Sequence, residues 1–308
     1  MKSKRILVVL GGTSGERKVS INSGQACVKA LKNLGYKVET HDPKAKPLNL
    51  IDRNKVDVIF NALHGKDGED GVAQSYFEYL RIPYTHSGVI SSYIAMNKVL
   101  SKKIFRDNKI LTPNYFVLKK GDFSKIKPSY LRKKKLNFPI VIKPVNEGSS
   151  IGVKICKNII EINRVSKKLF KEYPEIIFEP FIGGQEIQVA VLNGNPLGAI
   201  ELIPKRQFYD YKAKYSKSAN TTHIMPANLN KKNYNDALRI AKKAHNALGC
   251  KGVSRSDFKF FKNKFYLLEL NTQPGMTNLS LVPEIAEFNG ISFSSLVEKI
   301  LLNASLNR

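Results

Sequence analysis

The sequence predicts an α/β protein in which an open sheet unit precedes two units of mixed α+β character. The first observation is an apolar run over residues 6–10 that leads into a glycine turn and a predicted helix at 20–34, as in a buried parallel strand and its crossover. The second is the return of short apolar runs between residues 36 and 60, because alternation of strands and helices is typical of parallel sheets. The third is a pair of hairpin patterns, at 186–203 and 254–270, which indicates antiparallel sheet later in the chain.

The expected elements divide the chain into three segments, 1–97, 98–183 and 184–308. The stretch 208–226 is polar and has no period, and a loop of that length in a compact domain is usually functional. The expected strands are 6–10, 36–40, 56–60, 138–144, 151–155, 176–179, 186–192, 197–203, 254–261 and 264–270. The expected helices are 20–34, 91–108, 161–173, 231–248 and a last one that begins near Phe293.

The charge of the chain is unusual, with 51 Lys and Arg against 25 Asp and Glu, a formal net charge of +26. A hydrophobic fraction of 42% excludes a disordered chain, and the composition also excludes collagen-like and disulfide-scaffold classes. The basic residues are spread along the chain, and the densest run, 132–135, is typical of a solvated surface. Nucleic-acid binding is the alternative that the charge leaves open, and we do not expect it because no aromatic residues interleave with the basic run.

The three cysteines, Cys27, Cys156 and Cys250, stand far apart and form no metal-ligand spacing. An odd, scattered set of cysteines indicates reduced thiols, so we expect a cytoplasmic protein. No apolar run approaches the roughly 18–20 residues that span a bilayer, and we expect no membrane partner.

Two glycine-containing segments follow predicted strands of the first unit. Glu16 comes directly after the turn 11–15, at the carboxyl end of a strand, where open α/β sheets bind their ligands. A carboxylate at this position could hold an ammonium group. His64 opens the segment 64–71, which carries three glycines and three acids, and a histidine there is a plausible substrate contact. Ordinary turns, the second with an acidic helix start, remain the alternative for both segments.

The segment 143–153 is a candidate phosphate-binding loop. Lys143 ends a predicted strand, and a small loop with the hydroxyls of Ser149 and Ser150 follows it. Backbone N–H groups and hydroxyls of such a loop can surround phosphate oxygens, with the lysine as a point charge. A flexible hairpin is the alternative.

The strongest constellation joins Asp257 to Glu269 and Asn271. Residues two apart on a strand face the same side, so Glu269 and Asn271 point together, and Asp257 on the preceding hairpin strand can lie beside them. Two carboxylates and an amide oxygen form a donor set suited to Mg²⁺ that bridges nucleotide phosphates. Arg255 shares the face of Asp257 and would stabilise developing negative charge. A surface hairpin with solvated polar residues is the alternative.

A glycine and a serine farther along suit the same chemistry. Gly275 can expose a backbone N–H as an oxyanion donor, and Ser280 at a helix start can hold a carboxylate.

Taken together, the chain resembles the D-alanine–D-alanine ligases of the ATP-grasp superfamily. The similarity runs in family order over about residues 6–297. The matching segments are GGTSGERKVSINSG, ALHGKDGEDGVAQSYFEYLRIPYTHSGV, MNK, PIVIKPVNEGSSIGV, FYDYKAKY, MPA, GVSRSDF and LLELNTQPGMTNLSLVPEIAEFNGISF.

The resemblance implies an ATP-grasp fold with an N-terminal Rossmann-like pre-ATP-grasp domain. Residues 1–97 would be the substrate-binding domain, 98–183 the central ATP-grasp subdomain, and 184–308 the catalytic domain with 208–226 as its lid. The implied reaction phosphorylates one D-alanine with ATP and couples it to a second D-alanine for peptidoglycan precursor synthesis. Two Mg²⁺ ions, or Mn²⁺ in their place, and a homodimer are implied as well.

The resemblance also implies the nucleotide contacts. In related ligases, lysines that match Lys98 and Lys143 contact the α- and β-phosphates of ATP, and the lysine that matches Lys214 reaches the γ-phosphate. The other implied ATP contacts are Glu179, Ile182, Glu186 and Phe208. The implied metal ligands are Asp257, Glu269 and Asn271.

Roles toward the amino acids follow in the same way. Glu16 matches the carboxylate that holds the first ammonium, Ser149 and Tyr215 match its hydrogen-bonded partners, and His64 lies near the same substrate. Ser280 and Leu281 match the carboxylate site of the second substrate. The implied oxyanion stabilisers are Arg255 and the backbone of Gly275.

A ligase that takes D-lactate or D-serine as its second substrate is an alternative. The Lys214–Tyr215 pair favours the dipeptide-forming enzyme, because depsipeptide ligases generally differ there. The sequence departs from the usual family pattern at Lys18, His86, Asn97 and Pro180 and within 216–222.

Overall fold

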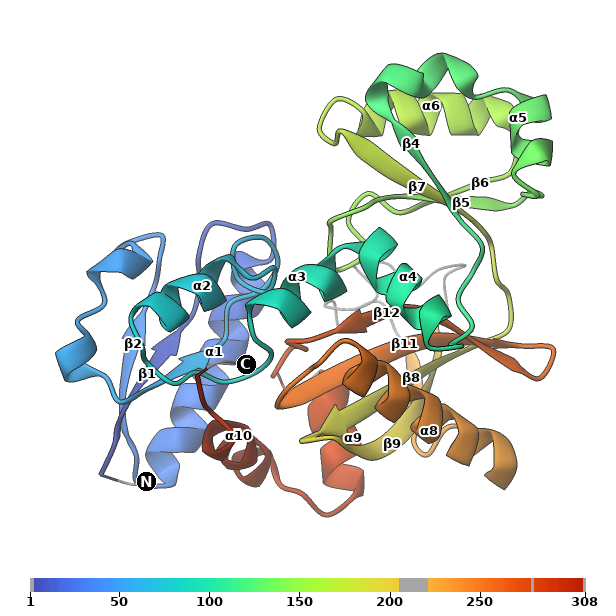
Figure 1. Cartoon of the computed structure of the whole chain (residues 1–308). Coiled ribbons are helices and arrows are strands. Elements are labelled where there is room, and N and C mark those ends of the chain that lie inside the picture. Colours follow the sequence, from blue (N-terminus) through green and yellow to red (C-terminus); the bar gives the residue numbers. More distant parts are fainter. Residues whose placement is uncertain (1–2, 205–220, 278–279, 307–308) are drawn as a thin grey trace.

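The computed structural model describes residues 3–204, 221–277 and 280–306, which form three sheets (Figure 1). The first sheet is parallel and has the order β2-β1-β3. Helix α1 connects β1 to β2 as the strand–helix alternation predicts. The elements are β1 (Arg5–Val9), α1 (Arg17–Asn33), β2 (Lys37–His41) and β3 (Val58–Asn61). Short 3₁₀ helices at Leu48–Leu50 and Arg53–Lys55 lie between β2 and β3.

Three helices lead from the first sheet to the second: α2 (Val72–Tyr79), α3 (Val89–Met96) and α4 (Lys98–Asp107). The single helix expected over 91–108 is therefore wrong. The chain breaks at Asn97, whose backbone is extended and whose side chain accepts hydrogen bonds from the N–H groups of Val99 and Leu100. Asparagine favours this capping arrangement over a helix interior, so α4 begins anew with its own cap.

The second sheet is antiparallel and has the order β4-β7-β5-β6. The strands are β4 (Phe116–Lys119), β5 (Ile140–Pro144), β6 (Lys154–Cys156) and β7 (Glu175–Pro180). A 3₁₀ helix at Lys120–Lys125 and two α-helices, α5 (Pro128–Lys133) and α6 (Ile159–Leu169), accompany them.

Two details of this sheet differ from the prediction. Strand β4 was not expected. Strand β6 begins at Lys154 instead of Ile151, because Ser149, Ser150 and Gly152 have positive φ angles of 49°, 61° and 72°, which no strand can hold.

The third sheet has the order β10-β9-β8-β11-β12. Its strands are β8 (Gln185–Leu192), β9 (Asn195–Ile203), β10 (Thr222–Ile224), β11 (Val253–Phe261) and β12 (Lys264–Asn271). Helices α8 (Lys231–Ala247) and α9 (Leu281–Phe288) pack against this sheet, and α10 (Phe293–Leu302) packs against α1 and α9. Most of the stretch 208–226, expected as one loop, lies outside the described residues. For residues 222–224 the loop prediction is wrong, because they pair with β9 as an edge strand.

One apolar core joins the first and third sheets. It contains Ile6 and Val8 of β1, Ile200 of β9, and Val282 and Leu296 of the last two helices. The second sheet has a separate core of its own, around Phe116, Ile140 and Phe178. In Figure 1 the second sheet accordingly stands above a base that the other two sheets form together.

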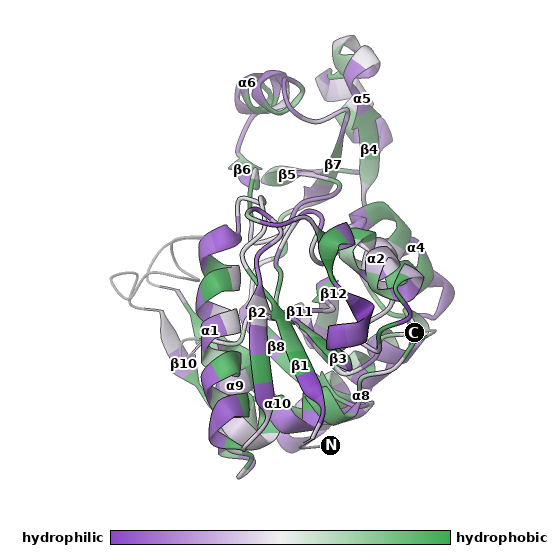
Figure 2. Ribbon diagram, turned by 90° about the vertical axis from the view of Figure 1, so that its left-hand side faces the viewer, coloured by the Kyte–Doolittle hydropathy of each residue, from purple (hydrophilic) through white to green (hydrophobic). Residues whose placement is uncertain are grey.

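The distribution of hydropathy agrees with these cores. In Figure 2 strand β1 is largely green, whereas purple, white and green segments alternate along α1. Among residues 3–204, 221–277 and 280–306, no helix has the length and apolar character needed to cross a bilayer. The three sheets fall within the three predicted segments, whose boundaries stay a prediction.

Candidate nucleotide and substrate site

A pocket of about 780 Å³ lies between the second and third sheets, where the predicted nucleotide residues meet. Strands β5 and β7 supply one wall, and β11 and β12 supply the other. The connection between β7 and β8 closes one end. Of the predicted nucleotide and metal residues, those that line this pocket are Lys98, Lys143, Glu179, Ile182, Glu186, Asp257 and Glu269.

Two predicted phosphate-binding lysines meet at one end of this pocket. Val141 of β5 stands opposite Glu179 of β7, so Lys143 lies two residues along on the same face, and its Nζ is 2.9 Å from a Glu179 oxygen. Lys98 opens α4; its Nζ donates to the backbone oxygen of Glu147 and lies 3.8 Å from Glu269. Burial lowers the pKa of Lys98, and the neighbouring carboxylate of Glu269 opposes this shift.

Part of the pocket lining is less polar. It includes Val141, Ile182 and Leu268, which suit a flat aromatic base. Glu186 at the start of β8 pairs with Lys259 of β11, with 3.0 Å between the charged atoms. This ion pair places a carboxylate and an ammonium group in the pocket lining, together with the less polar walls.

Strand register brings the predicted metal and oxyanion residues together. Asp257 on β11 stands opposite Glu269 on β12, and Arg255 stands opposite Asn271. Arg255 donates two hydrogen bonds to Asp257, at 2.7 and 3.0 Å. A register shift follows Asp257, and such an irregularity re-aims side chains next to functional sites. The four residues therefore form one patch that contains two carboxylates, one guanidinium and one amide.

A second pocket of about 490 Å³ adjoins the first. Arg255 and Asn271 line it from the third sheet, Ser149 lines it from the loop after β5, and Glu69 lines it from the first unit. Both pockets share three wall residues, which are Lys98, Glu147 and Glu269. The two pockets therefore meet at the charged end of the larger one.

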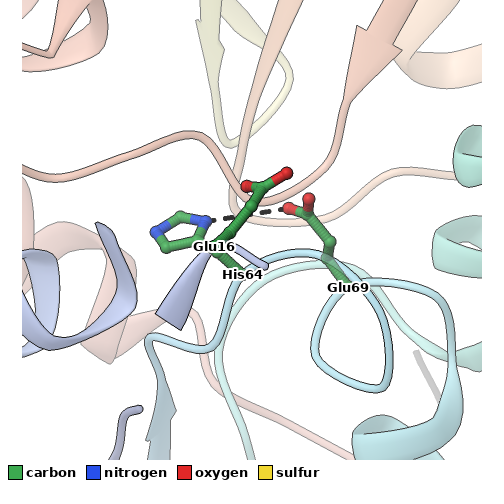
Figure 3. A group of neighbouring side chains, drawn as sticks. All are labelled: Glu16, His64 and Glu69. Atoms are coloured by element: carbon green, nitrogen blue, oxygen red, sulfur yellow. Dashed lines mark ion pairs between the residues drawn. The ribbon is translucent and has the colours of Figure 1, made fainter. Parts of the chain in front are cut away.

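The predicted residues of the first unit form a buried cluster with a residue that was not singled out. Glu16, His64 and Glu69 offer ligand atoms that all lie within 4.8 Å of one another (Figure 3). The side chains converge from the turn before α1 and from the loop after β3. The loop of the second unit comes close, because a Cβ added to Gly148 would stand 2.8 Å from a Glu16 oxygen. This donor set could hold a cation, either a metal ion or an ammonium group.

Hydrogen bonds orient the His64 ring. The N–H of Met276 donates to Oγ of Ser23 at 3.1 Å, and that Oγ lies 3.3 Å from Nε2 of His64. If the hydroxyl gives its own proton to Nε2, then Nδ1 carries the ring proton toward Glu69, 3.8 Å away. The ring is then held between the hydroxyl of Ser23, to which the third unit donates, and the carboxylate of Glu69.

Gly275, predicted as an oxyanion donor, and Ser280, predicted to hold a carboxylate, lie side by side. A Cβ added to Gly275 would stand 3.0 Å from Oγ of Ser280, so a side chain here would crowd the serine. Oγ of Ser280 accepts a hydrogen bond from the N–H of Thr277, and Leu281 begins helix α9. Three predicted residues, Phe208, Lys214 and Tyr215, lie outside the described residues.

The glycine turn before α1 binds a carboxylate of the chain itself. Gly11 and Gly12 have φ angles of 86° and 72°, and the N–H of Gly12 donates to Asp42 at 3.0 Å. Arg17 makes two further hydrogen bonds to Asp42, at 2.9 and 2.6 Å. A Cβ on Gly11 would stand 2.6 Å from the same carboxylate. The carboxylate of Asp42 thus accepts the hydrogen bonds that such a glycine turn could otherwise offer to an anionic ligand, and it fixes the turn that precedes Glu16.

Sequence reasoning missed several residues besides Asp42. Asn61, at the end of β3, donates to the side chain of Gln273 at 2.9 Å, and nothing in the sequence links two residues 212 positions apart. Lys102 lies fully buried behind the nucleotide pocket. The sequence does indicate the placement of Lys102, because it follows Lys98 by four residues and therefore shares its helix face.

A nucleotide-sized pocket between two antiparallel sheets, with lysines at one end and paired carboxylates beside them, defines the ATP-grasp class. Comparison with known proteins narrows this class. The model of the D-ala D-ala ligase N-terminus matches residues 36–87, and the model of the D-ala D-ala ligase C-terminus matches residues 104–302.

Individual relatives agree. The D-alanine–D-alanine ligase of Pelagibacter ubique is 55% identical over 99% of this chain and all of its own length. The D-alanine–D-alanine ligase of Geotalea uraniireducens is 45% identical over 99% of this chain and 97% of its own.

Solved structures extend the similarity to the fold. The D-alanine–D-alanine ligase of Bacillus anthracis in complex with ATP superposes with a TM-score of 0.83 at 30% identity, covering 98% of this chain and 97% of its own. The VanG D-Ala:D-Ser ligase of Enterococcus faecalis superposes with a TM-score of 0.83 at 27% identity, covering 97% and 98%.

The chain belongs to the D-alanine–D-alanine ligase family. It is an enzyme of the ligase class, and the predicted α/β, ATP-grasp fold is confirmed. The roles of the individual site residues stay predictions.

The Asp42 network gives a testable pH dependence. Hydrogen bonds from Arg17 lower the pKa of Asp42 to about 2. Because the folded pKa lies below the unfolded value of about 4, the ionised pair stabilises the fold above pH 4. This stabilisation is lost as the pH falls from about 4 to about 2. The difference in unfolding free energy between the parent and Asp42→Asn should therefore shrink over this range, measured by urea denaturation.

The matched control is Asp107→Asn, which changes an exposed carboxylate at the end of α4. A difference between the parent and Asp42→Asn that stays constant from pH 7 to pH 2 would contradict the role given to the pair.

Proposed function

We propose that this chain joins two D-alanine molecules to D-alanyl-D-alanine with ATP, for peptidoglycan precursor synthesis. ATP phosphorylates the carboxylate of the first D-alanine and leaves as ADP. The amine of the second D-alanine attacks the acyl phosphate, and phosphate departs. Membership in the D-alanine–D-alanine ligase family supports this reaction.

The observation that carries the proposal is the shared wall of the two pockets. Lys98, Glu147 and Glu269 line both of them, so a nucleotide in the larger pocket can direct its terminal phosphate into the smaller one. Positioning of two reactants in this way removes much of the entropy cost of their meeting.

We assign the nucleotide as follows. The base lies against the walls near Ile182, and the sugar lies near Glu186. Lys98 and Lys143 bind phosphates, because they project into the same end of the pocket. The family pattern adds Glu179 and Phe208 on the nucleotide side, and Lys214 at the γ-phosphate.

The first D-alanine binds at the buried acidic cluster. Glu16 takes its ammonium group, since its carboxylate is only 3% exposed and a buried carboxylate is stabilised by a cation. His64 lies beside it and Ser149 faces the same pocket from the second unit. The family pattern adds Tyr215 as the hydrogen-bonded partner of Ser149. An ammonium group suits this cluster better than a metal ion, because the proposed metal ligands lie in another sheet.

The second D-alanine binds with its carboxylate at the start of α9. Ser280 supplies a hydroxyl and Leu281 a backbone N–H, and the positive end of the helix dipole favours an anion there.

Mg²⁺ binds at Asp257, Glu269 and Asn271. The donor set fits, because all three side chains offer oxygen and cross-strand pairing places Asp257 beside Glu269. When bound, the metal would neutralise part of the negative charge of the phosphates. We propose two Mg²⁺ ions, for which Mn²⁺ can substitute.

Arg255 and the N–H of Gly275 stabilise the oxyanion of the transition state. Arg255 lines the smaller pocket, next to the proposed metal ligands, and is only 13% exposed. A guanidinium in such a place keeps its positive charge, and it attracts a nearby negative charge more strongly at low dielectric than in water.

The identity of the second substrate requires a separate test. Similarity to a D-Ala:D-Ser ligase at 27% identity keeps D-serine as a second candidate, whereas the relative at 55% identity is a D-alanine–D-alanine ligase. D-lactate is the third.

The deciding experiment measures ADP formation with D-alanine as the only amino acid, with and without Mg²⁺. We expect turnover with D-alanine alone, no turnover without a divalent ion, and dipeptide by mass spectrometry. Parallel reactions with added D-serine or D-lactate should leave D-alanyl-D-alanine as the main product. A mixed product in excess would overturn the assignment of the second substrate.

Arg255→Ala tests the oxyanion role. Loss of one oxyanion donor typically lowers the rate by about 10²–10³-fold, and we expect a loss of that size in kcat. The protein should remain folded, as judged by circular dichroism. Arg239→Ala, at an arginine 67% exposed on α8, is the matched control and should retain parent activity. Near-normal turnover of Arg255→Ala would disprove the assignment.

We propose a cytoplasmic homodimer that binds neither nucleic acid nor membranes. The three cysteines are free and buried, as suits a reducing compartment. We place the dimer surface on α2 and α3, because both helices carry exposed aromatic and aliphatic side chains. This proposed patch consists of Val72, Tyr76, Tyr79, Ile90 and Tyr93.

The dimer prediction is tested by Ile90→Glu, since Ile90 is 70% exposed at the patch. A charge in an apolar interface is desolvated without a partner, so this variant should run as a monomer in light scattering. Ile160→Glu, at a 77% exposed residue of α6, should leave the dimer intact. A monomeric parent protein at all concentrations would refute the patch as a dimer surface.

A further inference from the structure

Lys102 is a fully buried lysine that takes no part in the reaction proposed above. It lies on α4, has 0% exposure, and is absent from the residues that line the nucleotide pocket. Its Nζ donates to Oγ1 of Thr112 at 2.8 Å and lies 3.0 Å from one oxygen of Glu179. The other oxygen of Glu179 lies 2.9 Å from Nζ of Lys143. Glu179 therefore stands between two lysines.

The two lysines differ in what they can reach. Lys143 lines the pocket, so its amine can turn toward a nucleotide. Lys102 has no such access, because Thr112 and Glu179 hold its amine behind the pocket wall. Only one of the two cations can leave Glu179.

We propose that Lys102 is a positioning residue, a fixed counter-ion that holds Glu179 in its ionised form and thereby releases Lys143 to bind the phosphates of ATP. The inference rests on the proposed assignment of Lys143 to the phosphates.

Charge compensation supplies the reason. Glu179 is 3% exposed, and a buried carboxylate that loses its partner is strongly destabilised. If Lys143 were its only partner, nucleotide binding would strip the carboxylate of its cation. With Lys102 in place, the carboxylate keeps one ion pair while Lys143 exchanges its partner.

The surroundings of Lys102 keep it charged. Burial lowers its pKa to about 8, while Glu179 and, more distantly, Glu269 oppose this shift, and Lys143 adds to it. The amine therefore stays mainly protonated near neutral pH. Helix α4 thus contributes two lysines from one face, Lys98 to the pocket and Lys102 to the carboxylate behind it.

The test is Lys102→Met, which keeps the length of the side chain and removes its charge. Lys143 should then stay bound to Glu179, so KM for ATP should rise roughly tenfold or more, as when a buried pair must be broken. KM for D-alanine and kcat should change less than about threefold. A purely structural role would reduce the active fraction and would not move one KM alone. Lys103→Met, at the exposed neighbouring lysine, is the matched control.

Two further variants keep the outcome decisive. Thr112→Val leaves every charge in place and removes only the hydroxyl that fixes the amine of Lys102. This variant should raise KM for ATP by a smaller factor than Lys102→Met. If Lys102→Met does not fold, Thr112→Val tests the role of Lys102 in its place. Lys143→Met tests the assignment of Lys143 to the phosphates separately from the role of Lys102. If it leaves KM for ATP unchanged, the phosphate assignment fails. If Lys143→Met raises KM for ATP and a folded Lys102→Met or Thr112→Val does not, the role of Lys102 alone is overturned.

Discussion

The buried contact between Asn61 and Gln273 fixes the first unit against the third, and the geometry of the site depends on it. The side chain of Gln273 accepts from Asn61 at 2.9 Å and donates to the backbone oxygen of Leu63, next to His64. Its backbone N–H donates to Asn271 at 2.7 Å. Asn61 and Gln273 are almost completely buried, so these bonds are protected from water. A single residue thus ties a proposed metal ligand to the proposed substrate loop.

The surplus charge of the chain has a different distribution from the charge of the site. The net charge is +26, yet the site residues form a mixed set in which nearly every cation has a carboxylate within reach. Dispersed surface lysines are screened over about 10 Å and contribute little to any one contact. They supply a general positive potential that can draw ATP toward the cleft, while binding itself depends on the paired groups.

Much of the architecture could be predicted from the sequence, because strands such as 6–10 and 186–192 carry strong local patterns. The hairpin of Asp257 and Glu269 was predictable for the same reason, since alternation and a short turn fix which residues face each other. Strand β4 was not predictable, because four residues become a strand only by pairing with β7. Asp42 was missed because its partners lie 30 and 25 residues away along the chain. The spacing of Lys102 from Lys98 indicates a shared helix face, but it does not reveal that Lys102 is completely buried.

The proposed ligand-binding groups already have partners within the protein. Lys143 pairs with Glu179, Arg255 with Asp257, and Lys98 lies near Glu269. Binding of ATP and Mg²⁺ is then an exchange of partners, and the desolvation of these charges is completed during folding instead of during binding. An exchange of this kind requires that each abandoned group finds a new partner. Asp257 would gain the metal ion, and Glu179 would keep Lys102. Each carboxylate would therefore retain a cation, one from the ligand and one from the protein.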